Sequence, residues 1–248
     1  MIVAHRGASG DAPENTIPAF KRAWEQGADA IEGDFRLTKD GHIVCIHDND
    51  TKRVADTNLV VRQSTLAELR ALDVGIRRGE VFKGAVIPTI AEVFATVPPQ
   101  KKIFIEIKCG PEIIAPLLEE IGRSGLAAEQ VVLLSFSAEV IAALKDDAPQ
   151  YKALWLSKVK KNLLGKMTPS LKTVLATLKQ IKADGFSSNK NAVDAAFVRR
   201  IKEEGCEYHV WTVDDAKTAR RFEQWGADSI TTNCPGYIRQ MLRNKTKS

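Results

Sequence analysis

Residues 2–36 read IVAHRGASGDAPENTIPAFKRAWEQGADAIEGDFR and predict a strand, a helix and a second strand in succession. A short apolar run, Ile2–His5, precedes a segment with helical spacing that Thr16 can cap and Gly27 can end. A second apolar run, Ala30–Arg36, follows directly. Strands joined by a helix are the repeating unit of α/β proteins, so this stretch decides the fold class.

The same alternation continues to the end of the chain. Further strands are expected at Ile103–Lys108, Val131–Ser135, Ala153–Leu156, Gly185–Ser187, Tyr208–Thr212 and Ser229–Thr232. Helices are expected at Pro111–Gly125, Ala138–Asp147, Leu171–Lys182, Val193–Gly205, Asp215–Gly226 and Pro235–Arg243. About eight β-α units in 248 residues predict a (β/α)8 TIM barrel.

The alternative is an open, doubly wound sheet. Such a sheet would carry a glycine-rich phosphate-binding fingerprint after its first strand, and His5–Gly10, HRGASG, lacks the required spacing. The barrel is therefore favoured.

One region, from Leu37 to about Pro88, interrupts the rhythm and predicts an insertion after the second strand, at about residues 48–88. Its elements are a turn at 39–41, a strand-like run Ile43–Ile46, a short helix at Thr65–Leu72 and a glycine-rich loop at 75–84. Insertions at this end of a barrel strand cover the active-site face. No boundary is sharp enough for a second domain, so residues 1–248 are expected to form one.

Composition excludes a disordered or fibrous chain, with 44% hydrophobic and 27% charged residues. A net charge of +5 raises the question of a nucleic-acid partner. Two short stretches carry the excess: Lys158, Lys160, Lys161 and Lys166, then Arg239, Arg243, Lys245 and Lys247. Because neither stretch has aromatic residues interleaved for base stacking, we expect no nucleic acid as partner.

Four widely spaced cysteines form no CxxC pair, which favours a reducing compartment over a zinc site or a disulfide framework. The first residues lack the sections of a signal peptide, and no apolar run is long enough to span a membrane. We expect a cytoplasmic protein without stable membrane insertion. A homo-oligomer is compatible with the sequence.

Carboxylates gather near the ends of two predicted strands. Glu32 and Asp34 share one face of their strand, and Glu106 shares a face with Lys108. Acids close together in a barrel are costly unless a cation compensates them, and oxygen-only ligands favour Mg²⁺ or Ca²⁺. The structural alternative is that Glu106 pairs with Lys108 and the other two acids pair with arginines.

Two of the four histidines end predicted strands on the face that holds these acids, His5 in His-Arg-Gly and His47 before Asp48. Two imidazoles on opposite sides of a phosphate can act as general base and general acid. Arg6 and Lys108 can neutralise the phosphoryl oxygens.

Three further residues receive different interpretations. Trp211, near the end of the seventh strand, can pack against the carbon skeleton of a polyol, although core packing is equally common for an aromatic there. His42, in a turn, is interpreted as exposed, and His209, within a strand, as a core histidine.

With these motifs the chain resembles the glycerophosphodiester phosphodiesterase family over nearly its whole length. The motifs, in order, are His5-Arg6-Gly7, residues 13–16 (PENT), Glu32-Gly33-Asp34, 37–41 (LTKDG), His47-Asp48, 65–69 (TLAEL), 87–89 (IPT), Glu106-Ile107-Lys108, Trp211-Thr212-Val213, 226–228 (GAD) and 231–235 (TTNCP). Each motif alone is weak, but the ordered set is specific.

The resemblance implies a metal-dependent hydrolase that converts a small-molecule glycerophosphodiester into glycerol 3-phosphate and an alcohol. It further implies that Glu32, Asp34 and Glu106 hold a divalent cation, Mg²⁺ or Ca²⁺. On the same basis His5 and His47 are the acid-base pair, and Arg6 and Lys108 bind phosphate.

Two other functions are considered. A phospholipase of the C or D type acting on lysolipids should show an exposed apolar rim or a membrane-binding helix, and residues 37–88 show neither clearly. A non-catalytic binding barrel should have lost one of the two histidines or three acids, and all five are present. The preferred alcohol, the histidine that acts as base, and the choice between direct water attack and a cyclic phosphate stay open.

Overall fold

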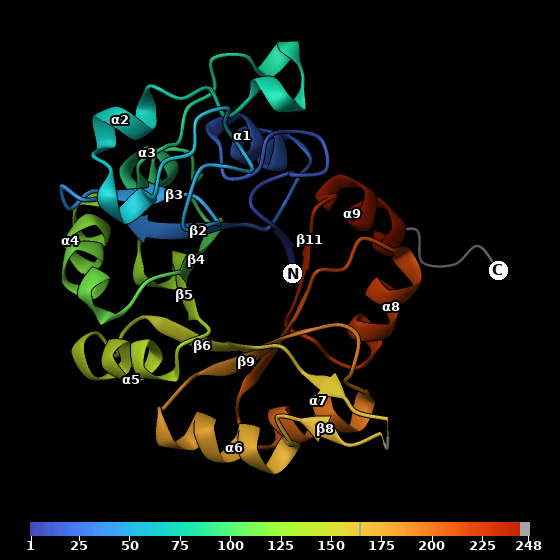
Figure 1. Cartoon of the computed structure of the whole chain (residues 1–248). Helices are drawn as coiled ribbons and strands as arrows, with labels where there is room; N and C mark the ends of the chain where they lie inside the picture. The colour runs from blue at the N-terminus through green and yellow to red at the C-terminus, as the bar shows by residue number, and fades with distance from the viewer. Residues whose placement is uncertain (164, 244–248) are drawn as a thin grey trace.

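The structure is a computed structural model that describes residues 1–163 and 165–243, so Lys245 and Lys247 of the basic tail lie outside the described residues. Within these residues eight parallel strands close into a barrel ringed by helices, as Figure 1 shows in a view along the barrel. The strands are β1 (Ile2–Ala4), β2 (Ala30–Leu37), β4 (Lys102–Ile107), β5 (Val131–Ser135), β6 (Lys152–Ser157), β9 (Gly185–Asn189), β10 (Glu207–Trp211) and β11 (Ser229–Thr232). The predicted (β/α)8 barrel is confirmed.

Strand β1 closes the ring because it pairs on both of its edges. Val3 lies opposite Ala30 of β2 on one side and opposite Thr231 of β11 on the other. The first and last strands of the described chain are therefore neighbours, and residues that follow them meet at the same end of the barrel.

The helices pack on the outside of the barrel (Figure 1). They are α1 (Ile17–Glu25), α2 (Leu66–Arg70), α3 (Ile90–Phe94), α4 (Ile114–Ser124), α5 (Ala138–Asp147), α6 (Leu171–Gln180), α7 (Ala195–Glu203), α8 (Ala216–Gln224) and α9 (Pro235–Arg243). The Thr16 side chain accepts a hydrogen bond from the Ala19 amide and caps α1, as predicted. Among the described residues, no helix is both long and apolar enough to cross a bilayer.

Helix α3 is absent from the sequence prediction. It has only five residues, too few to show a helical repeat, but a capping box between Thr89 and Glu92 defines its start. That local signal could have identified it.

The insertion between β2 and α3 begins with β3 (Ile43–Cys45), which pairs antiparallel with β2. A small apolar core of its own holds the segment together, formed by Val44, Ile46, Ala55, Val61, Leu69, Val74 and Ile87. In place of the predicted loop at 75–84, two short 3-10 helices, Ile76–Arg78 and Glu80–Phe82, form around the side chain of Asp73.

A second departure from the prediction follows β6. The basic stretch from Lys158 to Lys166, for which no strand is predicted, forms part of a short antiparallel hairpin, β7 (Lys160–Lys161) and β8 (Met167–Thr168). Two-residue strands are too short for a period-two pattern to reveal them.

Strand alternation divides the apolar residues into two layers. Side chains that point outward form the main core beneath the helices, with Ile31, Ile105 and Leu133 among them. Side chains that point inward form a smaller cluster that fills the barrel: Val3, Ala30, Phe104, Val132, Leu134, Leu154 and Leu156. The polar residues at the carboxyl ends of the strands lie directly above this inner cluster.

Candidate active site

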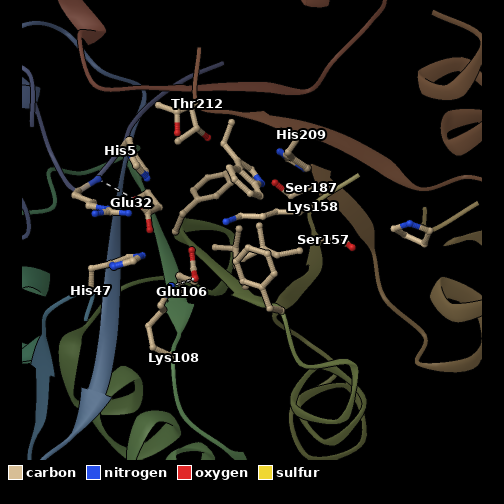
Figure 2. Close-up of a pocket in the computed structure, with 18 of the residues that line it drawn as sticks. His5, Glu32, His47, Glu106, Lys108, Ser157, Lys158, Ser187, His209 and Thr212 are labelled. Atoms are coloured by element: carbon tan, nitrogen blue, oxygen red, sulfur yellow. Dashed lines mark hydrogen bonds and ion pairs between the residues drawn. The ribbon is translucent and has the colours of Figure 1, made fainter. Parts of the chain in front are cut away.

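A cavity of about 850 Å³ opens at the carboxyl ends of the barrel strands. Figure 2 shows its walls, with His5, Glu32, His47, Glu106 and Lys108 on one side. Seven of the eight predicted site residues line it: His5, Arg6, Glu32, His47, Glu106, Lys108 and Trp211. The eighth, Asp34, is 1% exposed and lies just behind the wall.

The three predicted carboxylates form one cluster. Asp34 of β2 lies opposite Glu106 of β4 in the strand register, and Glu32 lies two residues earlier on the same face. One oxygen of each carboxylate lies within 4.8 Å of the others. Three acids so close, two of them buried, repel one another strongly unless positive charge compensates them.

The environment changes the pKa of each acid differently. Burial, reinforced by Asp34 and Glu106, raises the pKa of Glu32 well above its usual value. Burial and the charge of Asp34 raise the pKa of Glu106 to about 6. Burial also acts to raise the pKa of Asp34, but Arg6 and Lys108 outweigh it and hold that pKa below its usual value.

Protein cations neutralise only part of this cluster. The Lys108 ammonium lies 2.6 Å from Glu106 and 3.5 Å from Asp34, and the Arg6 guanidinium lies 3.2 Å from Asp34. The ion pairs of the structural alternative therefore exist for Glu106 and Asp34. Among the residues that the structure describes, no side-chain cation pairs with Glu32, and its buried Oε1 atom has no hydrogen-bond partner.

This unpartnered oxygen is the test of whether a metal ion fits. A buried carboxylate oxygen without a donor is costly, and a cation shared with Asp34 and Glu106 would satisfy it. The three ligands offer oxygen alone, which suits a hard divalent cation. The residues present could thus hold such an ion.

The loop after β1 supplies backbone as well as side chain to the cluster. Arg6 has a φ of 56°, and in this left-handed conformation its amide donates a hydrogen bond of 2.9 Å to Glu32. Gly7 follows with a φ of 79°, and a Cβ there would come within 2.6 Å of the Ala19 backbone in α1. The His-Arg-Gly motif therefore needs glycine third, because α1 packs against this turn.

Asn15, at the end of the same loop, holds Asp34 from the opposite side. Its amide nitrogen donates to Asp34 Oδ2 at 2.9 Å, and its own backbone amide donates to the Arg6 carbonyl. Asn15 belongs to the motif at residues 13–16 (PENT), but the motif alone does not indicate this role. The role depends on the loop after β1 folding back onto β2.

His5 is tied to the far end of the chain. Its Nδ1 atom lies 2.7 Å from Oδ1 of Asn233, which follows β11, and that oxygen also accepts a hydrogen bond from the Ser9 hydroxyl. Burial, together with the charge of Arg6, lowers the pKa of His5. The lowered pKa favours the neutral imidazole, which is the form that can accept a proton.

His47 belongs to the insertion and lines the cavity. A series of ion pairs fixes the orientation of its imidazole. Its Nδ1 atom lies 2.7 Å from Asp48, whose other oxygen accepts from Arg53, and Arg53 binds Glu14 through two nitrogens. Burial lowers the pKa of His47. With Nδ1 bound to a carboxylate, Nε2 is the atom free to exchange a proton in the cavity. Figure 2 shows His5 and His47 on either side of Glu32.

Arg36 of β2 binds backbone carbonyl groups of the site, and sequence reasoning did not identify this role. Its guanidinium donates to the carbonyl of His47 at 2.8 and 3.1 Å and to the carbonyl of Lys108 at 3.1 Å. The residues it joins are distant in sequence, so no local pattern reveals the contact. Arg36 thus connects the acid-base wall contributed by the insertion to the end of β4.

The opposite wall of the cavity is largely apolar. Leu134 and Leu156 point inward from β5 and β6, and Phe136 packs edge-on against Trp211 with ring centroids 5.7 Å apart. Phe104 forms the floor between the two walls. A carbon skeleton would find contact area on these apolar side chains.

Of the two remaining histidines, His42 is exposed as predicted, whereas His209 is buried but also lines the cavity. His209 is 1% exposed and lies between the Ser229 hydroxyl, at 2.7 Å, and Glu207, at 3.1 Å. His42 has a side chain that is 55% exposed, in the turn before β3.

Comparisons with known proteins agree with this geometry. The model of the glycerophosphoryl diester phosphodiesterase family matches residues 5–237. A glycerophosphodiester phosphodiesterase of Caldanaerobacter subterraneus subsp. tengcongensis is 35% identical over 98% of each chain. One of Bacillus subtilis is 30% identical over 98% of this chain and 86% of its own length. A phosphodiesterase of Oleispira antarctica, solved in complex with its product sn-glycerol-3-phosphate, has the same fold, with a TM-score of 0.89 at 24% identity over 98% of this chain and 97% of its own.

Proposed function

Because the chain belongs to the glycerophosphoryl diester phosphodiesterase family, we propose that it hydrolyses small glycerophosphodiesters to glycerol 3-phosphate and an alcohol. One observation carries the proposal: a buried, incompletely neutralised carboxylate cluster shares a cavity with two histidines whose pKa values are lowered by burial. An anionic ester beside a bound cation is the ligand that complements such a cavity.

The proposal includes a divalent cation, Mg²⁺ or Ca²⁺, held by Glu32, Asp34 and Glu106. When bound, such an ion neutralises phosphate charge and makes a nearby hydroxyl group more acidic. Arg6 and Lys108 carry the remaining positive charge of this wall, and both lie within reach of the same carboxylates. A phosphate that approaches the wall would meet both cations together.

His5 and His47 divide the proton transfers in this mechanism. One imidazole accepts a proton from the attacking hydroxyl as its oxygen forms a bond to phosphorus. The other gives a proton to the alcohol oxygen as the bond between that oxygen and phosphorus breaks. The attacking group is water, or a glycerol hydroxyl whose cyclic phosphate product water then opens.

Two arrangements keep these histidines in place. Asp48 binds Nδ1 of His47 and leaves Nε2 for the substrate, while Asn233 binds Nδ1 of His5. Trp211 and Phe136 support the carbon skeleton of the substrate from the far wall. Trp211 therefore contributes to binding in this proposal and takes no part in the proton transfers.

The wider setting is also a proposal. We infer that residues 1–248 act as one domain, in the cytoplasm and without nucleic acid. Support comes from four cysteines that are all free thiols and from the confinement of the basic excess to two short stretches. A homo-oligomer would be compatible with it.

The test is release of glycerol 3-phosphate from glycerophosphocholine, glycerophosphoethanolamine and glycerophosphoglycerol by chelator-treated protein supplied with Mg²⁺ or Ca²⁺. We expect turnover with a metal ion and none without it. Full activity after chelation contradicts the metal site. Turnover of lysophosphatidylcholine alone would favour the phospholipase alternative, and binding without turnover would favour a non-catalytic barrel.

A further inference from the structure

The charges that line the cavity are distributed unequally between its two walls. Both acids that line it, Glu32 and Glu106, belong to β2 and β4. The wall formed by the end of β6 and the hairpin after it carries Lys158 and Lys160, and within the described residues no acid lines that wall. A ligand that spans the cavity therefore meets carboxylates and their cations on one side and uncompensated lysines on the other.

Strand register directs Lys158 into the cavity. Leu154 and Leu156 of β6 point inward, and Lys158, which directly follows the last residue of β6, continues this alternation and lines the cavity. The residue between, Val159, is fully buried on the outer side, and its amide donates a 2.7 Å hydrogen bond to the Asn189 side chain. These two contacts hold the backbone, and Figure 2 shows the Lys158 side chain extending into the cavity.

Neither lysine has an acidic partner in the part of the chain that the structure describes. Other lysines around the barrel do: Lys145 pairs with Asp184 at 2.9 Å and Lys202 pairs with Asp228 at 2.7 Å. Two unpaired ammonium groups at the mouth of a concave site give it a positive potential, and the low-dielectric walls concentrate that field. The ligand that complements this wall is an anion.

We propose that Lys158, assisted by Lys160, selects glycerophosphodiesters whose alcohol carries a negative charge, such as a carboxylate or a second phosphate. The inference rests on the proposed function, in which Arg6 and Lys108 bind the diester phosphate. With the phosphate held there, one ester arm crosses the apolar wall and its end reaches Lys158. The Phe136–Trp211 pair alone could accept a quaternary ammonium group, but two lysines beside it repel such a cation.

The experiment uses three substrates whose alcohols have the same two-carbon spacer, and the choline and 3,3-dimethylbutanol esters also have the same shape. The glycerol 3-phosphate esters of choline, 3,3-dimethylbutanol and 3-hydroxypropionate place a cation, a neutral group or an anion two carbons from the ester oxygen. Specificity is the ratio of kcat/KM between the anionic and the neutral ester. For the wild-type protein we expect the order anionic, neutral, cationic, with the preference reduced at high salt.

Lys158→Gln should lower the anionic-to-neutral ratio about tenfold, the effect of one lost charge-assisted contact. Lys160→Gln should lower it less. Lys161→Gln is the matched control, because Lys161 is the neighbouring residue of the same strand but does not line this cavity. Its ratio should equal that of the wild-type protein.

Two results overturn the inference while the proposed function survives. One is a wild-type protein that hydrolyses all three esters without preferring the anion. The other is a Lys158→Gln variant in which kcat/KM falls equally for all three, because that lysine would then contact the shared glycerophosphate. Folded wild-type protein that hydrolyses none of them with Mg²⁺ or Ca²⁺ overturns the proposed function and this inference together.

Discussion

The two walls of the cavity are built from the same kind of strand and differ in the residues that occupy the inward positions. On β2 and β4 these positions hold Glu32, Asp34 and Glu106, whereas on β5 and β6 they hold Leu134 and Leu156. The register is continuous around the ring, since Glu106 lies opposite Leu134. Equivalent inward positions on neighbouring strands can therefore hold either a carboxylate or a leucine. We expect the first wall to carry the chemistry and the second to carry binding and specificity.

Changing the carboxylate wall should have the largest effect. Glu32→Gln removes the charge of the residue with the unpartnered oxygen, and we expect activity to fall about a thousandfold, as when a group that stabilises transition-state charge is lost. Titration calorimetry with Mg²⁺ or Ca²⁺ should show weakened metal binding. The control is Glu139→Gln, an exposed acid on α5. Glu32→Gln protein that keeps normal turnover and metal affinity would refute the division between the walls.

His47→Ala should follow, with kcat reduced about a hundredfold or more, because a positioned general acid or base contributes that much. The matched control is His42→Ala, which removes an exposed histidine from the turn before β3. Steady-state kinetics of both variants with one substrate make the comparison. Equal activities would remove His47 from the proton transfers.

Arg36→Ala should cost about tenfold in kcat, since His47 and Lys108 would lose the guanidinium that joins their backbones. Arg36→Lys should not restore activity, because one ammonium group cannot reproduce three donors in a planar fork. Arg62→Ala, which removes an exposed arginine from the insertion, is the control. If Arg36→Lys recovers full activity, charge alone accounts for the role of Arg36.

On the apolar wall, Trp211→Leu should act on binding more than on chemistry. We expect KM to rise about fivefold with a smaller change in kcat, because the indole supports the substrate skeleton in the ground state and transition state alike. Saturation curves for wild-type protein and variant supply both constants. A fall in kcat as large as that of His47→Ala would contradict the comparison.

We expect the smallest effect, a change in thermal stability, for Glu207, the first residue of β10. The hydrogen bond from His209, together with Lys152, lowers the pKa of Glu207 to about 2 from an ordinary value of 4.5. A carboxyl group with a lowered folded-state pKa stabilises the fold above pH 4.5 and loses that contribution as pH falls towards 2. In thermal melts without metal, wild-type protein should lose about 2 °C more than Glu207→Gln over this interval. Equal losses would show that Glu207 contributes nothing.

Much of this comparison could be predicted from local pattern. Period-two alternation placed Glu32 and Asp34 on one face, and strand ends supplied His5 and Trp211, because barrel enzymes assemble their sites at those ends. The ends of the eight strands were predicted to within two residues, since most of the strands are short apolar runs between polar turns.

What could not be predicted depends on contacts between distant segments. Arg36 acts on two backbone carbonyls, and Asn233 reaches His5 across the closure of the ring. The hairpin that follows Lys158 has strands of two residues each, below the length at which a pattern can be recognised. From the sequence these lysines are only part of a basic stretch, and the structure shows that Lys158 and Lys160 line the cavity.

The hydrogen bond between His5 and Asn233 has a consequence for synthesis on the ribosome. These residues are 228 positions apart, and β1 has its β11 neighbour only after nearly the whole described chain has been made. A nascent chain that ends before β11 already contains the three acids, His47 and Lys108, yet it lacks the partner that orients His5. Activity should therefore arise at a late, single step, when the last strand docks beside the first.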